Sequence, residues 1–281
     1  MDKPVCKFFL ESRCTKGDQC NFNHILVDPK NSRDPGSYNK NKNKSKLNRT
    51  KLVKVNTETF EPWYEPPHMQ VIVLDPKKPN PDLTESDVFL LSGLFDELEQ
   101  KSGQDVYSKL LDEIEGSGKP LDQLWKPWHG DKHLIADDHL RWKEFCPIFN
   151  SIINKISEYF NMDVKATRFN LYEDLRDYKP MHFDAAAIDP KKAATQNLTI
   201  GVSFGYTRSI EFEHATNRCR VSFPITNGTI YGFGKQINID WRHGIPPIKP
   251  EIIESINSNN SIKSTGRVSI IAWGKSNQKK I

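Results

Sequence analysis

The chain has 281 residues, a net charge of +4 and a hydrophobic content of 36%. This length suits one large domain or two smaller ones, and no apolar run reaches the roughly 18 residues that a membrane-spanning helix needs. The first residues lack the pattern of a secretory signal peptide, so we expect the five cysteines to be reduced thiols or metal ligands. Collagen, coiled-coil and membrane proteins are excluded.

The positive charge is concentrated in one short segment. Residues 1–29 are neutral overall, residues 30–54 carry nine basic residues and one acidic residue, and residues 55–281 carry a net charge of −4. The basic segment alternates lysine with asparagine, which is typical of a disordered linker. The sequence therefore predicts a cysteine-rich head at 1–27, a basic linker at 28–56 and a globular body at 57–281.

The head contains a set of metal-binding side chains with the spacing C-x7-C-x5-C-x3-H. Three thiolates and an imidazole suit tetrahedral Zn(II), and a segment this short has no core without a metal. The predicted zinc ligands are Cys6, Cys14, Cys20 and His24.

This spacing resembles the CCCH zinc finger family. The resemblance implies that Phe8 or Phe9, together with Phe22, stacks on bases of single-stranded RNA. The alternative is that these phenylalanines only cover the zinc.

Helical patterns come first in the body. Residues 84–115 mix helical spacing with a possible capping motif at Thr84. Residues 138–160 predict an amphipathic helix whose apolar face contains Phe145, Phe149, Ile152, Ile153 and Ile156.

From residue 164 the apolar residues alternate as in strands. Six short segments, rich in β-branched and aromatic residues, are predicted strands: 164–172, 197–204, 209–214, 220–225, 228–234 and 267–274. We predict a mostly β fold, an antiparallel double-sheet barrel or jelly roll with helices buttressing one face.

Two His-x-Asp pairs, His129/Asp131 and His182/Asp184, are candidate metal ligands. An imidazole and a carboxylate two residues apart, joined by a distant histidine, form a facial triad that leaves iron positions open. Only the second pair lies between predicted strands and is followed by a suitable histidine, His243. The alternative is a structural pair and a core histidine.

These residues resemble the AlkB-type 2-oxoglutarate/Fe(II) dioxygenases over about residues 165–275. The resemblance implies a double-stranded β-helix, oxygen as a substrate and oxidative removal of an alkyl group, usually from a nucleobase. It implies that Fe(II) is bound by His182, Asp184 and His243. It also implies that 2-oxoglutarate is bound by Asn170, Tyr172 and Arg267. The alternative for Arg267 is a surface salt bridge.

The chain departs from the family pattern in two places. The family's second arginine falls on Trp273, so its role is either lost or taken by Arg242 or Lys275. A Ser/Asn-rich insert at 253–266 predicts a surface loop.

Other residues have open interpretations. His129, Asp131 and His133 could line the substrate side, with a flipped base clamped by Trp125, Trp128 and Trp142. Alternatively, these tryptophans pack helices onto the barrel. We expect Cys146 and Cys219 to be buried and His214 to face solvent.

The predicted function is therefore oxidative demethylation of alkylated nucleobases, with the finger binding nucleic acid and RNA favoured over DNA. The basic linker could add phosphate contacts. A monomer in the nucleus or cytoplasm is expected. The alternatives are a protein hydroxylase or demethylase and a catalytically weak RNA-binding scaffold.

Overall fold

The computed structural model describes residues 69–281, except for 101–104, 129–131, 259–263 and 278–281. The chain divides into two units after Trp63, and every described residue belongs to the second. The predicted zinc ligands, the stacking phenylalanines, the linker, His129 and Asp131 lie outside the described residues.

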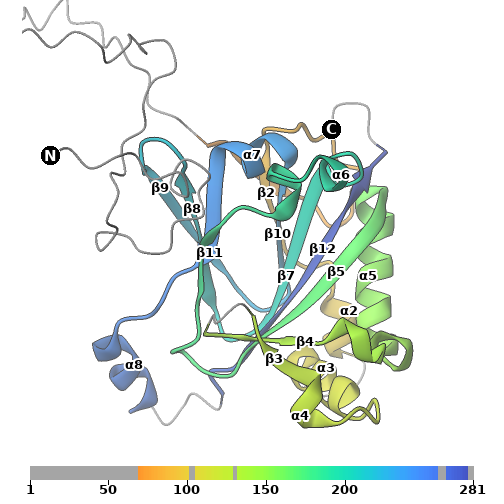
Figure 1. The fold of residues 1–281 in the computed structure, drawn as a ribbon, viewed down its shortest axis with the longest axis vertical. Coiled ribbons are helices and arrows are strands. Elements are labelled where there is room, and N and C mark those ends of the chain that lie inside the picture. The colour runs from red at the N-terminus through yellow and green to blue at the C-terminus, as the bar shows by residue number, and fades with distance from the viewer. Residues whose placement is uncertain (1–68, 101–104, 129–131, 259–263, 278–281) are drawn as a thin grey trace, which may run out of the picture. The chain divides into compact units, whose positions relative to one another are not determined.

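The body is built from two sheets (Figure 1). The larger has the order β1-β2-β10-β7-β12-β5-β4-β3 and the smaller β6-β11-β8-β9. All neighbours are antiparallel except β1 and β2. The larger sheet contains β1 (Val71–Leu74), β2 (Val88–Leu91), β3 (Trp125–Pro127), β4 (Leu134–Ala136), β5 (Met162–Tyr172), β7 (Leu198–Gly205), β10 (Thr229–Gly234) and β12 (Arg267–Ser276). The smaller contains β6 (Lys179–His182), β8 (Arg208–His214), β9 (Arg220–Ile225) and β11 (Trp241–Ile245). The predicted jelly roll and its six strand segments are confirmed.

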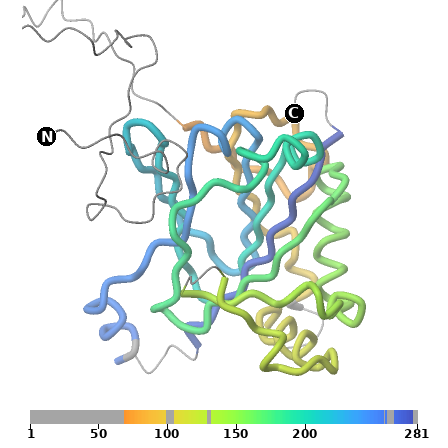
Figure 2. Tube along the Cα trace, viewed as in Figure 1, coloured from red at the N-terminus to blue at the C-terminus, as the bar shows by residue number. Residues whose placement is uncertain are grey.

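Helices cover one face of the larger sheet, as the trace in Figure 2 also shows. The described α-helices are α2 (Asp96–Gln100), α3 (Val106–Glu115), α4 (Leu121–Leu124), α5 (Pro147–Phe160), α6 (Pro190–Ala193), α7 (Lys235–Asp240) and α8 (Pro250–Asn257). Three short 3-10 segments span Asp138–Leu140, Trp142–Phe145 and Ala185–Ala187. Helix α5 packs on β5, while α3 packs on β7 and α5.

The contact between α3 and α5 has a polar component. Glu113 of α3 accepts hydrogen bonds from the first free backbone N–H groups of α5, at Ile148 (2.7 Å) and Phe149 (3.0 Å). A carboxylate in this position satisfies donors that have no partner within the helix and faces the positive end of its dipole. Helix α3 therefore caps the N-terminus of α5.

Two parts of the helical prediction are wrong. Val88–Leu91 forms a strand rather than a helix. It pairs with β1 and β10, and three of its four residues are buried. The motif at Thr84 does form, because the Thr84 N–H donates to Asp87 Oδ2 at 2.6 Å, but a strand follows it. Phe145 is 54% exposed, because the helix starts only at Pro147.

The larger sheet separates two hydrophobic cores. The first lies between this sheet and the helices, and the second lies between the two sheets. Strand β12 contributes to both, because successive side chains point to opposite faces. Val268, Ile270 and Ala272 belong to the helix-side core, whereas Arg267, Ser269, Ile271 and Trp273 alternate with them and face the smaller sheet.

Three smaller expectations fail. The 253–266 insert is partly helical, because α8 extends to Asn257. Cys219 is exposed although Cys146 is buried, and His214 packs half-buried against Trp241 at 5.0 Å between ring centroids. Among the described residues, no helix is long and apolar enough to cross a membrane.

Candidate metal centre and co-substrate site

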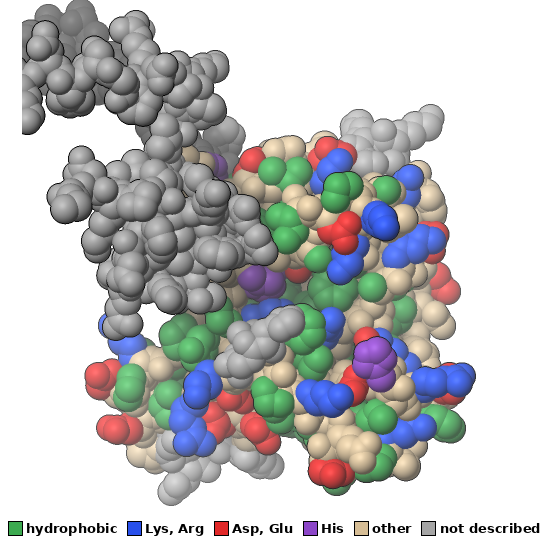
Figure 3. Space-filling model, in the orientation of Figure 1, with side chains coloured by type: hydrophobic (Ala, Val, Ile, Leu, Met, Phe, Trp, Pro, Cys, Tyr) green, Lys and Arg blue, Asp and Glu red, His purple; other side chains and the backbone are tan. Residues whose placement is uncertain are grey.

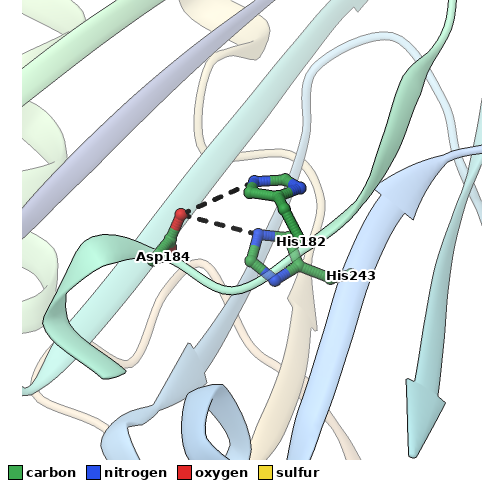
Figure 4. A group of neighbouring side chains, drawn as sticks. All are labelled: His182, Asp184 and His243. Atoms are coloured by element: carbon green, nitrogen blue, oxygen red, sulfur yellow. Dashed lines mark ion pairs between the residues drawn. The ribbon is translucent and has the colours of Figure 1, made fainter. Parts of the chain in front are cut away.

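Three predicted metal ligands meet between the sheets (Figure 4). His182 ends β6 and lies directly opposite His243 of β11, and Asp184 follows two residues after His182. The Nε2 atom of each histidine is 3.7 Å from Asp184 Oδ1. The three ligand atoms lie within 4.8 Å of one another, which is close enough for one ion to contact all three after small adjustments. Two imidazoles and a carboxylate suit Fe(II).

The protonation of His182 also suits metal binding. Its Nδ1 lies 2.9 Å from the carbonyl oxygen of Pro180, and a carbonyl can only accept, so Nδ1 carries the hydrogen. Nε2 is then left with a lone pair for the metal. Burial, His243 and Lys179 lower the pKa of His182, and burial likewise lowers that of His243. Both rings are neutral, which is the form that binds metals.

Hydrogen bonds hold both the carboxylate and the backbone of Asp184. Oδ2 accepts from Trp273 Nε1 at 2.8 Å and from Thr199 Oγ1 at 3.1 Å. The Asn238 side chain accepts from the Asp184 backbone N–H at 2.9 Å and donates to its carbonyl at 3.3 Å. The pKa of Asp184 lies below its usual value: burial opposes ionisation, but positive charge on either neighbouring imidazole, when protonated, and the Trp273 N–H both favour the carboxylate. The result is an ionised, oriented ligand.

Arg267 is a buried cation with unused donors. Its side chain is 0% exposed, so the alternative prediction of a surface salt bridge is wrong. Nε donates to Ser203 Oγ at 2.7 Å, and the guanidinium carbon lies 4.7 Å from the centre of the Tyr172 ring. Both terminal nitrogens have no hydrogen-bond partner among the described residues. Because a buried charge without partners is costly, this arrangement suits a carboxylate ligand bound through two parallel hydrogen bonds.

Asn170 and Tyr172 complete the predicted set on β5. They lie directly opposite Ser269 and Arg267 of β12, and Asn170 Nδ2 donates to the Ser269 carbonyl at 3.1 Å. Both line a narrow cavity that His182, Asp184 and His243 also line. Five of the six predicted residues thus line one cavity, and the sixth, Arg267, lies against the ring of Tyr172.

The sequence reasoning missed several residues of this site. They are Lys179, Thr199, Ser203, Tyr231, Asn238 and Ser269. Tyr231 has the clearest signal, since strand alternation in 228–234 places it on the inner face. Its buried ring lies directly opposite Gly201, where any Cβ would overlap it.

A second, more open cavity of about 540 Å³ adjoins the metal ligands. His182 and Asp184 form part of its wall, which also includes Trp128, Arg168, Phe183, Ile188, Lys192 and Trp273. The Arg168 guanidinium lies 3.8 Å from the centre of a Trp128 ring. Figure 3 shows basic, acidic and hydrophobic side chains interspersed on the face of the molecule drawn there.

The other described residues expected on the substrate side, Trp125, Trp142 and His133, lie elsewhere. Trp142 is buried against Phe149 and Phe169. This supports the alternative that it packs helices onto the barrel. Trp125 donates to Glu115 and packs near Phe169. His133 is 2% exposed and stacks on the Tyr172 ring at 5.0 Å. It therefore belongs to the co-substrate side.

Neither residue expected to replace the family's second arginine lines these cavities. Arg242 forms an ion pair with Glu213, and Lys275 is exposed on β12. Trp273 itself contacts the metal-ligand carboxylate. Neither Arg242 nor Lys275 therefore takes over the arginine's role in these cavities.

Comparisons with known proteins found matches for the head and for the body. Residues 1–26 match the family model "Zinc finger C-x8-C-x5-C-x3-H type (and similar)"; the first spacing here is one residue shorter. No curated protein sequence matches the chain. A structure described as "The structure of OsALKBH1" is similar over 66% of this chain and 97% of its own, with 12% identity and a TM-score of 0.44. A 2OG-Fe(II) oxygenase family oxidoreductase from Burkholderia pseudomallei is similar over 69% and 88%, with 14% identity and a TM-score of 0.38. The head thus matches a zinc finger model, and the body is similar in fold to these two solved structures.

Proposed function

We propose that this protein is an iron- and 2-oxoglutarate-dependent dioxygenase that demethylates alkylated nucleobases, with RNA favoured over DNA. The observation that carries the proposal is the pairing of two features on one inner surface: the His182/Asp184/His243 set and the buried, unused donors of Arg267. A metal would explain the first feature, and an anionic ligand would explain the second.

The side chains have separate roles in this proposal. His182 Nε2, Asp184 Oδ1 and His243 Nε2 would hold Fe(II) from one side. The terminal nitrogens of Arg267 would bind the distal carboxylate of 2-oxoglutarate, and Asn170 and Tyr172 would line its path to the metal. When bound, iron and 2-oxoglutarate would supply the oxidation of a C–H bond by molecular oxygen.

The chain's own contribution is geometry and shelter from water. Asp184 is oriented before any ligand arrives, because four hydrogen bonds hold its carboxylate and backbone. Buried neutral imidazoles need no deprotonation before they bind metal. His182 and Asp184 also line the open cavity, so a methyl group placed there would lie beside the metal.

The open cavity supports a flat, anion-bearing substrate. Trp128 and Trp273 offer aromatic surface, on which a nucleobase can stack, and Arg168 and Lys192 offer positive charge toward phosphate. The volume of about 540 Å³ lies within the usual range for ligand pockets. The finger at 1–27 and the basic linker would add nucleic-acid contacts outside the described residues.

The test is a turnover assay with the full chain, Fe(II), 2-oxoglutarate and oligonucleotides that carry N-methylated bases. We expect succinate and formaldehyde to form with loss of the methyl mass, and H182A to abolish both. Methylated peptides and methylated DNA serve as parallel substrates. Turnover confined to peptide would favour the protein hydroxylase, and absence of 2-oxoglutarate binding by the metal-loaded protein would contradict the proposal.

A further inference from the structure

Trp273 stands between the two cavities. Its side chain lines the narrow cavity together with Asn170 and Tyr172. It also lines the open cavity together with Trp128. Its indole N–H donates to Asp184 Oδ2 at 2.8 Å. One side chain therefore contacts a metal-ligand carboxylate and also forms a wall shared by the two spaces.

The backbone around Trp273 favours this contact. On β7 its direct neighbour is Thr199, which donates to the same carboxylate oxygen. On β5 its neighbour is the small Ala166, and the register shifts immediately afterwards, because Gly274 pairs with Val164 and leaves Lys165 without a counterpart. Such a bulge redirects side chains and is common next to functional sites.

The two hydrogen bonds make the carboxylate oxygens unequal. Oδ2 is occupied by Trp273 and Thr199, whereas Oδ1 faces both histidines. A carboxylate with two free oxygens can bind a metal through both and occupy an additional position. Partners outside the ligand set commonly orient a ligand in this way.

We propose that Trp273 is a positioning residue that holds the Asp184 carboxylate with Oδ1 turned toward the metal. The inference rests on the proposed function, because it requires a metal at His182, Asp184 and His243. It also accounts for the departure from the family's arginine pattern, since an indole N–H supplies a hydrogen bond to the carboxylate without adding a charge.

The test measures the affinity of the full chain for Mn(II), followed by the electron paramagnetic resonance signal of the free ion. Mn(II) prefers oxygen and nitrogen ligands, so the thiolates of the predicted finger compete weakly. W273F keeps an aromatic wall but removes the donor, and we expect Mn(II) to bind about 10- to 100-fold more weakly. The matched control is W125F. Trp125 also donates a hydrogen bond to a carboxylate, that of Glu115 at 3.3 Å, but neither residue belongs to the predicted metal-ligand set. This control should bind Mn(II) like the wild type.

H182A separates failure of the inference from failure of the proposed function. If H182A binds Mn(II) as the wild type does, the metal site itself is wrong. If H182A loses binding while W273F stays within twofold of the wild type, only the role of Trp273 is overturned. Should circular dichroism show that W273F is unfolded, benzothienylalanine at position 273 keeps both rings, lacks the N–H and is judged by the same criteria.

Discussion

Replacing Arg267 with methionine should stabilise the ligand-free protein while abolishing its response to 2-oxoglutarate. The guanidinium is fully buried, and its two terminal nitrogens have no hydrogen-bond partner among the described residues. The side chain therefore costs folding free energy that only a ligand would recover. A residue retained for binding is expected to behave in this way.

The magnitude follows from the contacts of Arg267. Removing two unsatisfied buried donors relieves about 1–3 kcal/mol each, and losing the bond to Ser203 costs about 1 kcal/mol. Losing the contact with the Tyr172 ring costs about another 1 kcal/mol. The net gain is about 2 kcal/mol in the free energy of unfolding, or about 4–8 °C in Tm for a body of this size.

The assay is thermal unfolding of the Mn(II)-loaded protein with and without 2-oxoglutarate. At a hundredfold excess over Kd the wild type should gain about 2.7 kcal/mol, whereas R267M should gain nothing. The control is R208M, because Arg208 is also buried but donates to the carbonyls of Asp177 at 2.9 Å and Pro246 at 2.8 Å; its loss should destabilise the protein. An R267M variant that is less stable than the wild type and still responds to 2-oxoglutarate would refute the reasoning.

Further predictions concern pH, the co-substrate pocket and the head. Burial and the nearby charge of Lys179 lower the pKa of His133 to about 4, below the unfolded value of about 6.5. As pH falls, the unfolded state therefore binds the proton first. His133 should thus lower the free energy of unfolding by up to about 3 kcal/mol between about pH 6.5 and pH 4. H133F should flatten urea-unfolding stability against pH in that window, and an unchanged slope would contradict the burial effect. G201A should displace Tyr231 and weaken 2-oxoglutarate binding by calorimetry; normal affinity with an intact fold would show that Tyr231 is dispensable. Deleting residues 1–54 should weaken RNA binding and flatten its dependence on salt while leaving Mn(II) affinity unchanged, and a retained salt slope would place the basic surface in the body.

The sequence predicted the strands of the barrel well because their local signals agree with their tertiary environment. The six segments from residue 164 onward combine alternation with β-branched and aromatic residues, and each becomes a strand. Val88–Leu91 was mistaken for helix because four consecutive apolar residues carry no period. A strand buried on both faces and a buried helical turn look alike at that length.

The candidate site was predicted as a set of residues but not as a network. His182, Asp184, His243 and Arg267 were found because few residue types perform their chemistry. Thr199 and Asn238 were missed because their roles depend on long-range pairing: Asn238 is 54 residues from Asp184 in sequence yet bonds its backbone. The contact between Trp273 and Asp184 spans 89 residues, and no local pattern encodes it.

The alternation along β12 has an evolutionary consequence. Its odd-numbered residues Arg267, Ser269, Ile271 and Trp273 face the smaller sheet, and its even-numbered residues Val268, Ile270 and Ala272 pack against the helices. A one-residue insertion or deletion would exchange the two sets, burying the guanidinium among apolar helices and moving the aliphatic side chains into the site. Because folding and ligand binding are encoded in alternate residues of this strand, it can diversify by substitution but not by changes in length.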